Sequence, residues 1–175
     1  GNRYGYASLE YWDYGSGSIT NHFHVRGDYA FNIPGAKAGM GWIFDAPVTL
    51  TGDAVFNTFS QFFQFNRPIG GVGDLTIVSG QNAANGNHSR FCAANTYQGA
   101  THIEDKGAHW LTAYGTFGTG PVTVDKTSSV VFDGSAGYAM TQAYACLGST
   151  EIRAANLSFL GKTAVAQTIV TDTTT

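Results

Sequence analysis

Charge is scarce in this chain: charged residues make up 12% of its 175 residues, about half the usual share for a globular domain. The formal net charge is −3, and the nine lysines and arginines are scattered without forming a basic stripe. We therefore expect no nucleic-acid partner, because contact with a phosphate backbone needs clustered positive charge. Sparse charge with abundant glycine and threonine is more typical of an extracellular protein than of a cytosolic enzyme.

Proline and long apolar runs are also rare. The chain has 4 prolines but 23 glycines, so its turns must be made by Gly, Asn and Asp. No apolar stretch approaches the roughly 20 residues that a helix needs to cross a bilayer, and we expect no membrane span. No helical i, i+3, i+4, i+7 pattern persists for about twelve residues either, which argues against a doubly wound α/β fold.

Cysteine is limited to Cys92 and Cys146, and neither has neighbours at metal-ligand spacing. Two cysteines fit one disulfide in an oxidising compartment, and we favour that pairing over two free buried thiols. The chain begins at Gly1 without an initiator methionine, which we interpret as a mature secreted chain or an excised fragment.

Catalytic motifs are missing. The sequence has no G-x-S-x-G, no H-E-x-x-H and no phosphate-binding glycine loop. Glycoside cleavage needs two acids held about 5–10 Å apart across a cleft. Most of the 12 acidic residues sit beside glycine or at strand ends, and Glu104-Asp105 is the only adjacent pair. We therefore expect no enzymatic activity and no cofactor, since a fold alone does not confer activity.

Short alternating runs of β-branched and aromatic residues, closed by Gly, Asn or Ser, fill most of the chain. They predict strand, sharp turn and strand, with no room for a helix. Three runs that begin at Val48, Leu75 and Thr101 are 27 and 26 residues apart, and two that begin at Val130 and Leu157 are 27 apart. A period of this size indicates stacked repeats, each forming one coil of a β-helix.

Four of these pieces occur in a distinctive order. They are 47–54 (PVTLTGDA), 69–80 (IGGVGDLTIVSG), 95–103 (NTYQGATHI) and 118–124 (GTGPVTV). This order resembles the strand repeat of bacterial autotransporter passengers, over roughly residues 43–132. The resemblance implies a right-handed parallel β-helix on an exported, surface-associated or shed protein. The chain departs from the family in its interruption at 81–94, its cysteines and its many aromatic and histidine residues.

We predict one domain covering 1–175, an all-β, right-handed parallel β-helix (a β-solenoid). Residues 1–42 would form an aromatic N-terminal cap with strands, and 43–132 repeat-like coils with an inserted loop at 81–94. Residues 133–175 would form the C-terminal coils and a tail. Open solenoid ends expose strand edges, so they must be capped or paired.

Two aromatic segments each have two interpretations. Either could be a contact surface for sugars or for another subunit, because Tyr and Trp are effective anchors. Either could instead plug the end of the β-helix. They are the run from Phe56 to Phe65 and the N-terminal cluster of Tyr4, Tyr6, Tyr11, Trp12 and Tyr14.

Histidines and surface motifs complete the candidate sites. His22 and His24 share a strand face and could hold a metal with Asp28, but we favour two surface imidazoles and expect no metal. We interpret Arg26-Gly27-Asp28, an integrin-type tripeptide, as a hairpin turn. Asn87 begins a glycosylation acceptor pattern in the predicted loop. His102 and His109 are interpreted as turn or surface residues without a partner.

These features favour an exported bacterial structural or adhesive surface protein, secreted or held at the cell surface. Its β-helix would be a scaffold that assembles with copies of itself into a filament or an extracellular matrix layer, with host or matrix glycans as further partners. The alternative is a carbohydrate-binding or carbohydrate-cleaving β-helix protein. A flat row of exposed Tyr and Trp side chains along one face would favour that alternative.

Overall fold

The fold is seen in a computed structural model. It describes residues 7–10, 17–32, 41–57, 62–79, 88–105, 109–113, 116–132, 139–152 and 158–170. All regular elements in these ranges are β-strands, and the strands pair in parallel throughout. Within the same ranges, no helix is long and apolar enough to cross a membrane.

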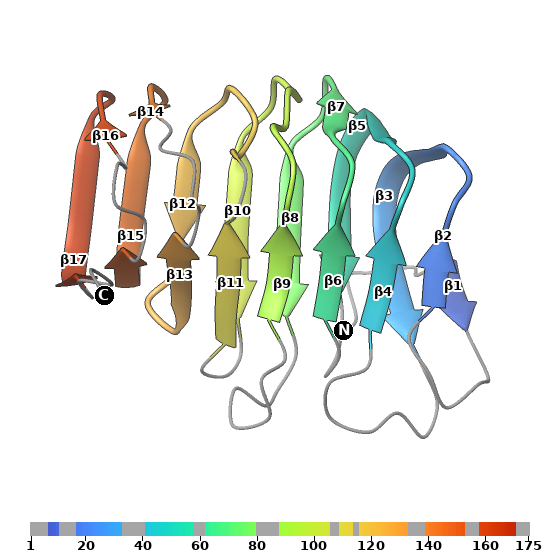
Figure 1. The fold of residues 1–175 in the computed structure, drawn as a ribbon, viewed down its shortest axis with the longest axis horizontal. Helices are drawn as coiled ribbons and strands as arrows, with labels where there is room; N and C mark the ends of the chain where they lie inside the picture. Colours follow the sequence, from blue (N-terminus) through green and yellow to red (C-terminus); the bar gives the residue numbers. More distant parts are fainter. Residues whose placement is uncertain are drawn as a thin grey trace, which may run out of the picture.

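The strands line three sides of a coil. The front face of Figure 1 contains β2 (Gly17–Ile19), β4 (Gly41–Phe44), β6 (Phe62–Phe65), β9 (His88–Phe91), β11 (His109–Ala113) and β13 (Ser128–Phe132). The back face contains β1 (Ala7–Glu10), β3 (Phe23–Asn32), β5 (Val48–Asn57), β8 (Leu75–Ser79), β10 (Thr101–Asp105) and β12 (Val122–Val124). The short side carries β7 (Ile69–Gly71), β14 (Ala139–Met140) and β16 (Ser158–Phe159).

Two long strands join the faces at the C-terminal end. The first part of β15 (Tyr144–Ile152) pairs with β12 on the back face, and its last part pairs with β13 on the front face. The strand β17 (Thr163–Val170) follows β15 around the same bend.

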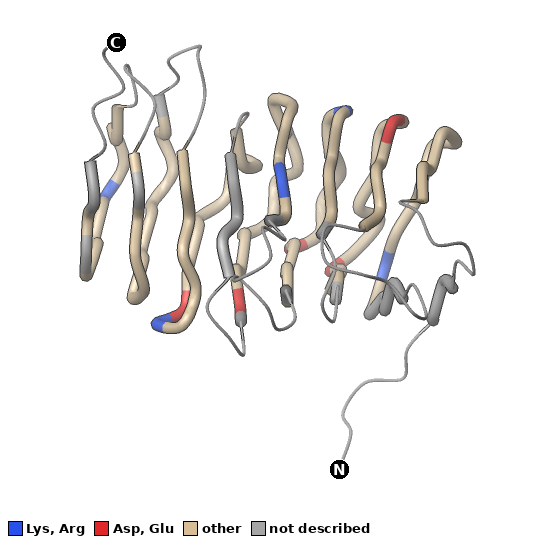
Figure 2. The backbone as a smooth tube through the Cα atoms, turned by 60° about the horizontal axis from the view of Figure 1, so that its bottom comes forward, with Lys and Arg blue, Asp and Glu red and all other residues tan. Residues whose placement is uncertain are grey.

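The chain rises along the front face, crosses the short side and descends along the back face as it advances from one end to the other (Figure 1). This path is a right-handed parallel β-solenoid. The predicted fold class is therefore confirmed. Among the described residues, lysine, arginine, aspartate and glutamate are few and spread along the stack, as Figure 2 shows.

Only one of the three predicted spacings matches the register of the strands. Leu75 lies opposite Thr101, as the 26-residue spacing predicted. Val48, however, lies opposite Ile69, because β5 bends and serves two sides of the coil. In the same way Val130 lies opposite Thr150 and not opposite Leu157. The long spacing belongs to the coil that contains residues 81–94. The prediction of an inserted loop is wrong for part of this segment, because residues 88–91 form β9 and pair with β6 and β11.

A ladder of phenylalanines fills the interior. The rings of Phe44 and Phe65 stack with centroids 4.8 Å apart, and those of Phe65 and Phe91 stack at 5.3 Å. Edge-to-face contacts continue the ladder through Phe117 and Phe132. Each such pair contributes about 0.5–1.5 kcal/mol beyond its buried area. The coils are therefore held together along the axis by aromatic contacts.

This ladder shows which role the aromatic run from Phe56 to Phe65 has. Phe56, Phe63 and Phe65 are fully buried, so these members of the Phe56 to Phe65 run belong to the core and form no contact surface. The other cluster, Tyr4, Tyr6, Tyr11, Trp12 and Tyr14, lies outside the described residues.

Glycine is required where successive coils touch at the corner between the short side and the back face. A Cβ atom on Gly73 would lie 1.8 Å from the carbonyl oxygen of Gly52, and one on Gly99 would lie 2.3 Å from that of Gly73. Real Cβ atoms do not approach backbone so closely, so only glycine allows this stacking.

The Arg26-Gly27-Asp28 sequence is not a hairpin turn, and that prediction is wrong. It lies inside β3, where the register against β5 shifts between Val25 and Gly27. Gly27 adopts a φ of 93° at this bulge, a backbone conformation that glycine supplies without strain.

The predicted disulfide is not formed, because Cys92 and Cys146 are free thiols. Cys146 is buried on the back face. It pairs with Val124, which in turn pairs with Ile103. Such a series of paired positions, one from each coil, is called a column below. Cys92 follows β9 in the coil of Ile103, two strand spacings away from Cys146. Two spacings amount to about 10 Å, whereas bridged Cα atoms lie within about 7 Å. The columns of the solenoid thus keep the two sulfurs apart.

Candidate functional site

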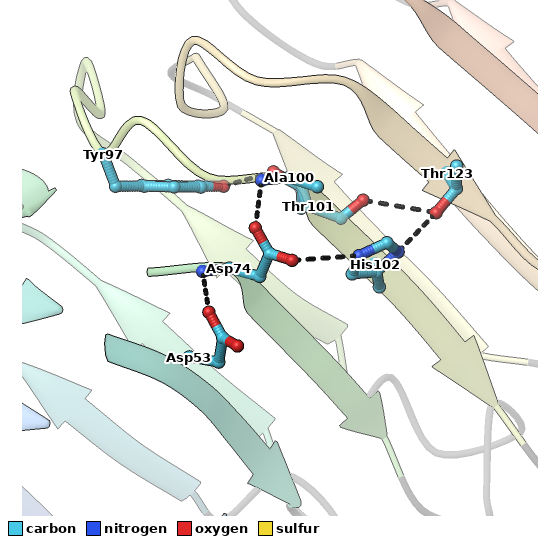
Figure 3. Close-up of polar contacts among 7 residues, drawn as sticks. All are labelled: Asp53, Asp74, Tyr97, Ala100, Thr101, His102 and Thr123. Atoms are coloured by element: carbon cyan, nitrogen blue, oxygen red, sulfur yellow. Dashed lines mark hydrogen bonds and ion pairs between the residues drawn. The ribbon is translucent and has the colours of Figure 1, made fainter. Parts of the chain in front are cut away.

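One set of polar side chains lies where the short side turns into the back face. Asp53, Asp74, His102 and Thr123 come from four successive coils, and Figure 3 shows them as one row. We call this row the polar ladder. Each aspartate follows a glycine of the corner and precedes a buried residue of the strand, so the alternation of the strand leaves it outside the core.

The two aspartates cap backbone groups of the following coil. Asp53 accepts a hydrogen bond from the backbone N–H of Asp74, with Oδ1 at 3.0 Å from the nitrogen. Asp74 accepts one from the N–H of Ala100 at 2.7 Å (Figure 3). Each carboxylate therefore satisfies a corner N–H that the strand pairing leaves open, and charge-assisted bonds of this type are among the stronger ones.

His102 extends the ladder in both directions. Its Nδ1 lies 2.8 Å from Thr123 Oγ1, and its Nε2 lies 3.9 Å from Asp74 Oδ2 (Figure 3). The prediction of a partnerless surface histidine is thus half right: His102 is on the surface, but it has partners one coil away on each side. The sequence does place polar residues about one coil length before and after His102. They can be recognised as its partners only when the register of the strands is known.

A hydroxyl, an imidazole and a carboxylate in this order are the parts of a nucleophilic triad. Two observations separate the polar ladder from such a site. The 3.9 Å contact exceeds a hydrogen bond, and the side chains of His102 and Asp74 are 36% and 46% exposed. Water therefore screens the pair, whose contribution to stability is at most about 1 kcal/mol. The arrangement links coils, and the 3.9 Å separation of Nε2 and Oδ2 is not the hydrogen bond that orients the imidazole of a triad.

A second set of polar groups links coils from the inside. Asn95 is buried and bonds two other coils: its Oδ1 accepts from the N–H of Ile69 at 2.8 Å, and its Nδ2 donates to Thr116 O at 2.6 Å. Within one coil, the buried hydroxyl of Tyr97 bonds that of Thr101. Burial raises the pKa of Tyr97 to about 12, and the bonds to Thr101 and to the backbone of Gly118 oppose this rise only in part.

A third set lies outside the front face. Asp45 accepts from Ser18 Oγ at 2.8 Å and from Asn66 Nδ2 at 2.6 Å. Gln64 donates to Asn66 at 2.8 Å and accepts from Arg90 at 3.2 Å. The bonds from Asn66 and Ser18 lower the pKa of Asp45. We call these five residues, Ser18, Asp45, Gln64, Asn66 and Arg90, the front network. It runs across the strands β2, β4, β6 and β9, so its hydrogen bonds also connect neighbouring coils.

The histidine pair shows no completed metal site. The rings of His22 and His24 stack with centroids 4.3 Å apart, and His22 Nε2 lies 2.8 Å from Thr49 Oγ1. No group of three potential metal ligands occurs among the described residues. Asn87, the candidate glycosylation site, lies outside those residues.

A half-open cavity of about 160 Å³ lies on the short side. It is smaller than the roughly 300–1,000 Å³ of typical ligand sites. Two of its lining residues already form hydrogen bonds between neighbouring coils: Asn95 bonds Thr116, and Gln142 donates to the carbonyl of Gly118 at 2.8 Å. Its lining is Asn95, Thr116, Phe117, Gly118, Thr119, Met140, Thr141 and Gln142.

Among the side chains that the structure describes, there is no exposed row of Tyr and Trp of the kind that would favour glycan binding. Every described aromatic side chain of defined exposure is buried or half-buried.

Comparison with known proteins returns nothing: no family model, no curated protein and no solved structure matches the chain. The resemblance to autotransporter passengers therefore stays a prediction.

Proposed function

We propose that the protein is an exported bacterial structural or adhesive surface protein, whose β-solenoid is a scaffold that assembles with copies of itself into a filament or layer. The observation that carries this proposal is the use made of polar side chains. The polar ladder, Asn95 and the front network all bond one coil to the next. Groups placed in this way stiffen a rod and are not available to act on a substrate.

The composition supports the same proposal. Charge is only 12% of the residues, and the strands are rich in threonine and glycine, as in proteins that work outside the cell. The resemblance to autotransporter passengers points to the cell surface or the surrounding matrix. Host or matrix glycans are the class of adhesive partner to test.

The test is particle length as a function of concentration. Negative-stain electron microscopy and sedimentation velocity should show rods that lengthen as the protein concentration rises. A rod of constant length and monomer mass at all concentrations would contradict the assembly part of the proposal. Binding to a glycan array, followed by a reducing-sugar assay, would instead support the alternative of a carbohydrate-binding or carbohydrate-cleaving protein.

A further inference from the structure

We infer that His22 and His24 form a surface binding site for a divalent transition-metal ion, and that Cu²⁺ is the ion bound most tightly. The site goes beyond the proposed function, because a scaffold built from hydrogen-bonded coils needs no metal. Four features of the described residues support it: two imidazoles on one outer face, the stacking of their rings, their exposure, and a hydroxyl that holds one ring.

The two rings are brought together where β3 begins on the short side. His24 pairs with Thr49, which pairs in turn with Gly70 of β7. Between the histidines, Phe23 packs against the core, so alternation leaves both imidazoles outside. Side chains two residues apart on a strand start roughly 7 Å from each other. The ring centroids are only 4.3 Å apart and the planes meet at 28°, so the rings lean toward one another.

This separation suits two ligands of one ion. Imidazole nitrogens bind transition metals at about 2.0–2.1 Å, so two of them in neighbouring coordination positions are about 3 Å apart. Stacked rings at 4.3 Å reach that distance by small rotations about the side-chain bonds. Both side chains are exposed, so they are free to rotate and water can fill the remaining coordination positions.

Thr49 prepares one of the two rings. His22 Nε2 lies 2.8 Å from Thr49 Oγ1. When Nε2–H donates to this hydroxyl, Nδ1 carries the lone pair that a metal needs. A hydrogen bond from the second ring nitrogen is usual for metal-bound histidine, where it fixes the tautomer and the orientation of the ring. Thr49 is therefore a positioning residue, and Nδ1 is the ligand atom of His22.

The number of ligands selects the metal. Zinc sites in proteins use three or four protein ligands, and no group of three potential ligands occurs among the described residues. Asp28, the third ligand considered from the sequence, lies beyond the bulge of β3 and pairs with Val55 on the back face. Two imidazoles completed by water give the tetragonal nitrogen and oxygen set of Cu²⁺ and Ni²⁺ sites, and Cu²⁺ binds the tighter of the two.

The experiment titrates the full chain with Cu²⁺ alone, by isothermal titration calorimetry, and records the electron paramagnetic resonance spectrum. We expect one tight equivalent per chain, with coupling to two imidazole nitrogens. His22→Gln and His24→Gln should each lose this equivalent. The double variant should bind no more weakly than either single variant, because chelation needs both rings. The matched control is His102→Gln, which removes an imidazole elsewhere and should leave the tight equivalent unchanged.

Thr49→Val tests the positioning role. It should weaken Cu²⁺ binding by about 10–100-fold and keep the two-nitrogen spectrum, a combination that a merely structural role would not produce. Unchanged affinity in this variant would overturn the role of Thr49.

Three results would overturn the site itself: no tight equivalent in the wild type, a wild-type spectrum with fewer than two imidazole nitrogens, or a tight equivalent that survives in the double variant. Cys92 is present in every variant, so copper bound to its thiol contributes equally to all of them. Circular dichroism verifies that each variant folds. Particle length, which tests the proposed function, should be the same in the wild type and in all these variants.

Discussion

The middle coils and the last coil share one strand pattern, yet their inner side chains have different surroundings. Phe65 and Phe91 are fully buried between neighbouring coils, whereas Val165 and Thr168 point into the same core and remain accessible. Burial in this molecule is therefore provided by the next coil and not by the residue's own coil. Stability in such an array is a sum of contacts between neighbours, so the end is weakest.

The largest expected effect contrasts two phenylalanines. Phe91→Ala removes a ring from the centre of the ladder and should lower the free energy of unfolding by about 3–5 kcal/mol. Phe159→Ala, at the partly exposed end, should cost clearly less. Urea unfolding followed by circular dichroism measures both. Equal losses would contradict the view that a neighbouring coil decides the value of a core residue.

Glycine substitutions test the contact between coils directly. Gly99→Val must displace the Gly73 carbonyl, and we expect a loss of about 3 kcal/mol or more. Gly161→Val meets the carbonyl of Gln142 at 2.1 Å, but it lies in the last coil, which can detach without opening the rest. Hydrogen exchange should then show loss of protection in residues 158–170 alone.

The matched control for both is Gly70→Ala, whose Cβ would meet only Thr96 Oγ1 at 3.4 Å. It should leave the unfolding midpoint almost unchanged. A large loss in this control would show that glycine is needed here for a reason other than close approach.

Tyr97 gives the interior a dependence on alkaline pH. Its pKa is raised from 10.0 to about 12, so between these values the unfolded chain loses the proton while the folded protein keeps it. Stability is thus fully present below pH 10 and falls as the pH rises, by up to about 3 kcal/mol. Tyr97→Phe should remove this part of the alkaline decline, measured by unfolding at several pH values. An unchanged decline would contradict the assignment.

Asp45 provides the smallest and opposite effect. Its pKa is lowered by Asn66 and Ser18, so it contributes stability above the ordinary pKa of 3.8, which is lost as the pH falls through the lower folded value. Asp45→Asn should make acid unfolding less steep, with little effect near neutral pH. Because the residue is exposed, a large loss of stability at neutral pH would be unexpected.

The sequence was informative about where strands and turns lie. It was much less informative about which residues of successive coils lie opposite one another. Alternation and Gly-Asp corners predicted the solenoid, since one coil is a local pattern. The pairing of Val48 with Ile69 could not be predicted, because nothing local shows that β5 bends across two sides. The same gap produced the wrong disulfide and hid the contact of His102 with Thr123, 21 residues away. Each depends on register, which the whole stack determines.

The unequal coils have a practical consequence. Asp74 bonds Ala100 across 26 residues, while His102 bonds Thr123 across 21, and both coils still meet in register. Register is fixed by the strands, so coils of different length stack on one another without disturbing the core. The cost of a longer connection rises slowly, since each doubling of a loop's length costs only about 0.6 kcal/mol. A solenoid of this kind can therefore gain or lose residues between its strands while the stacked interior stays the same.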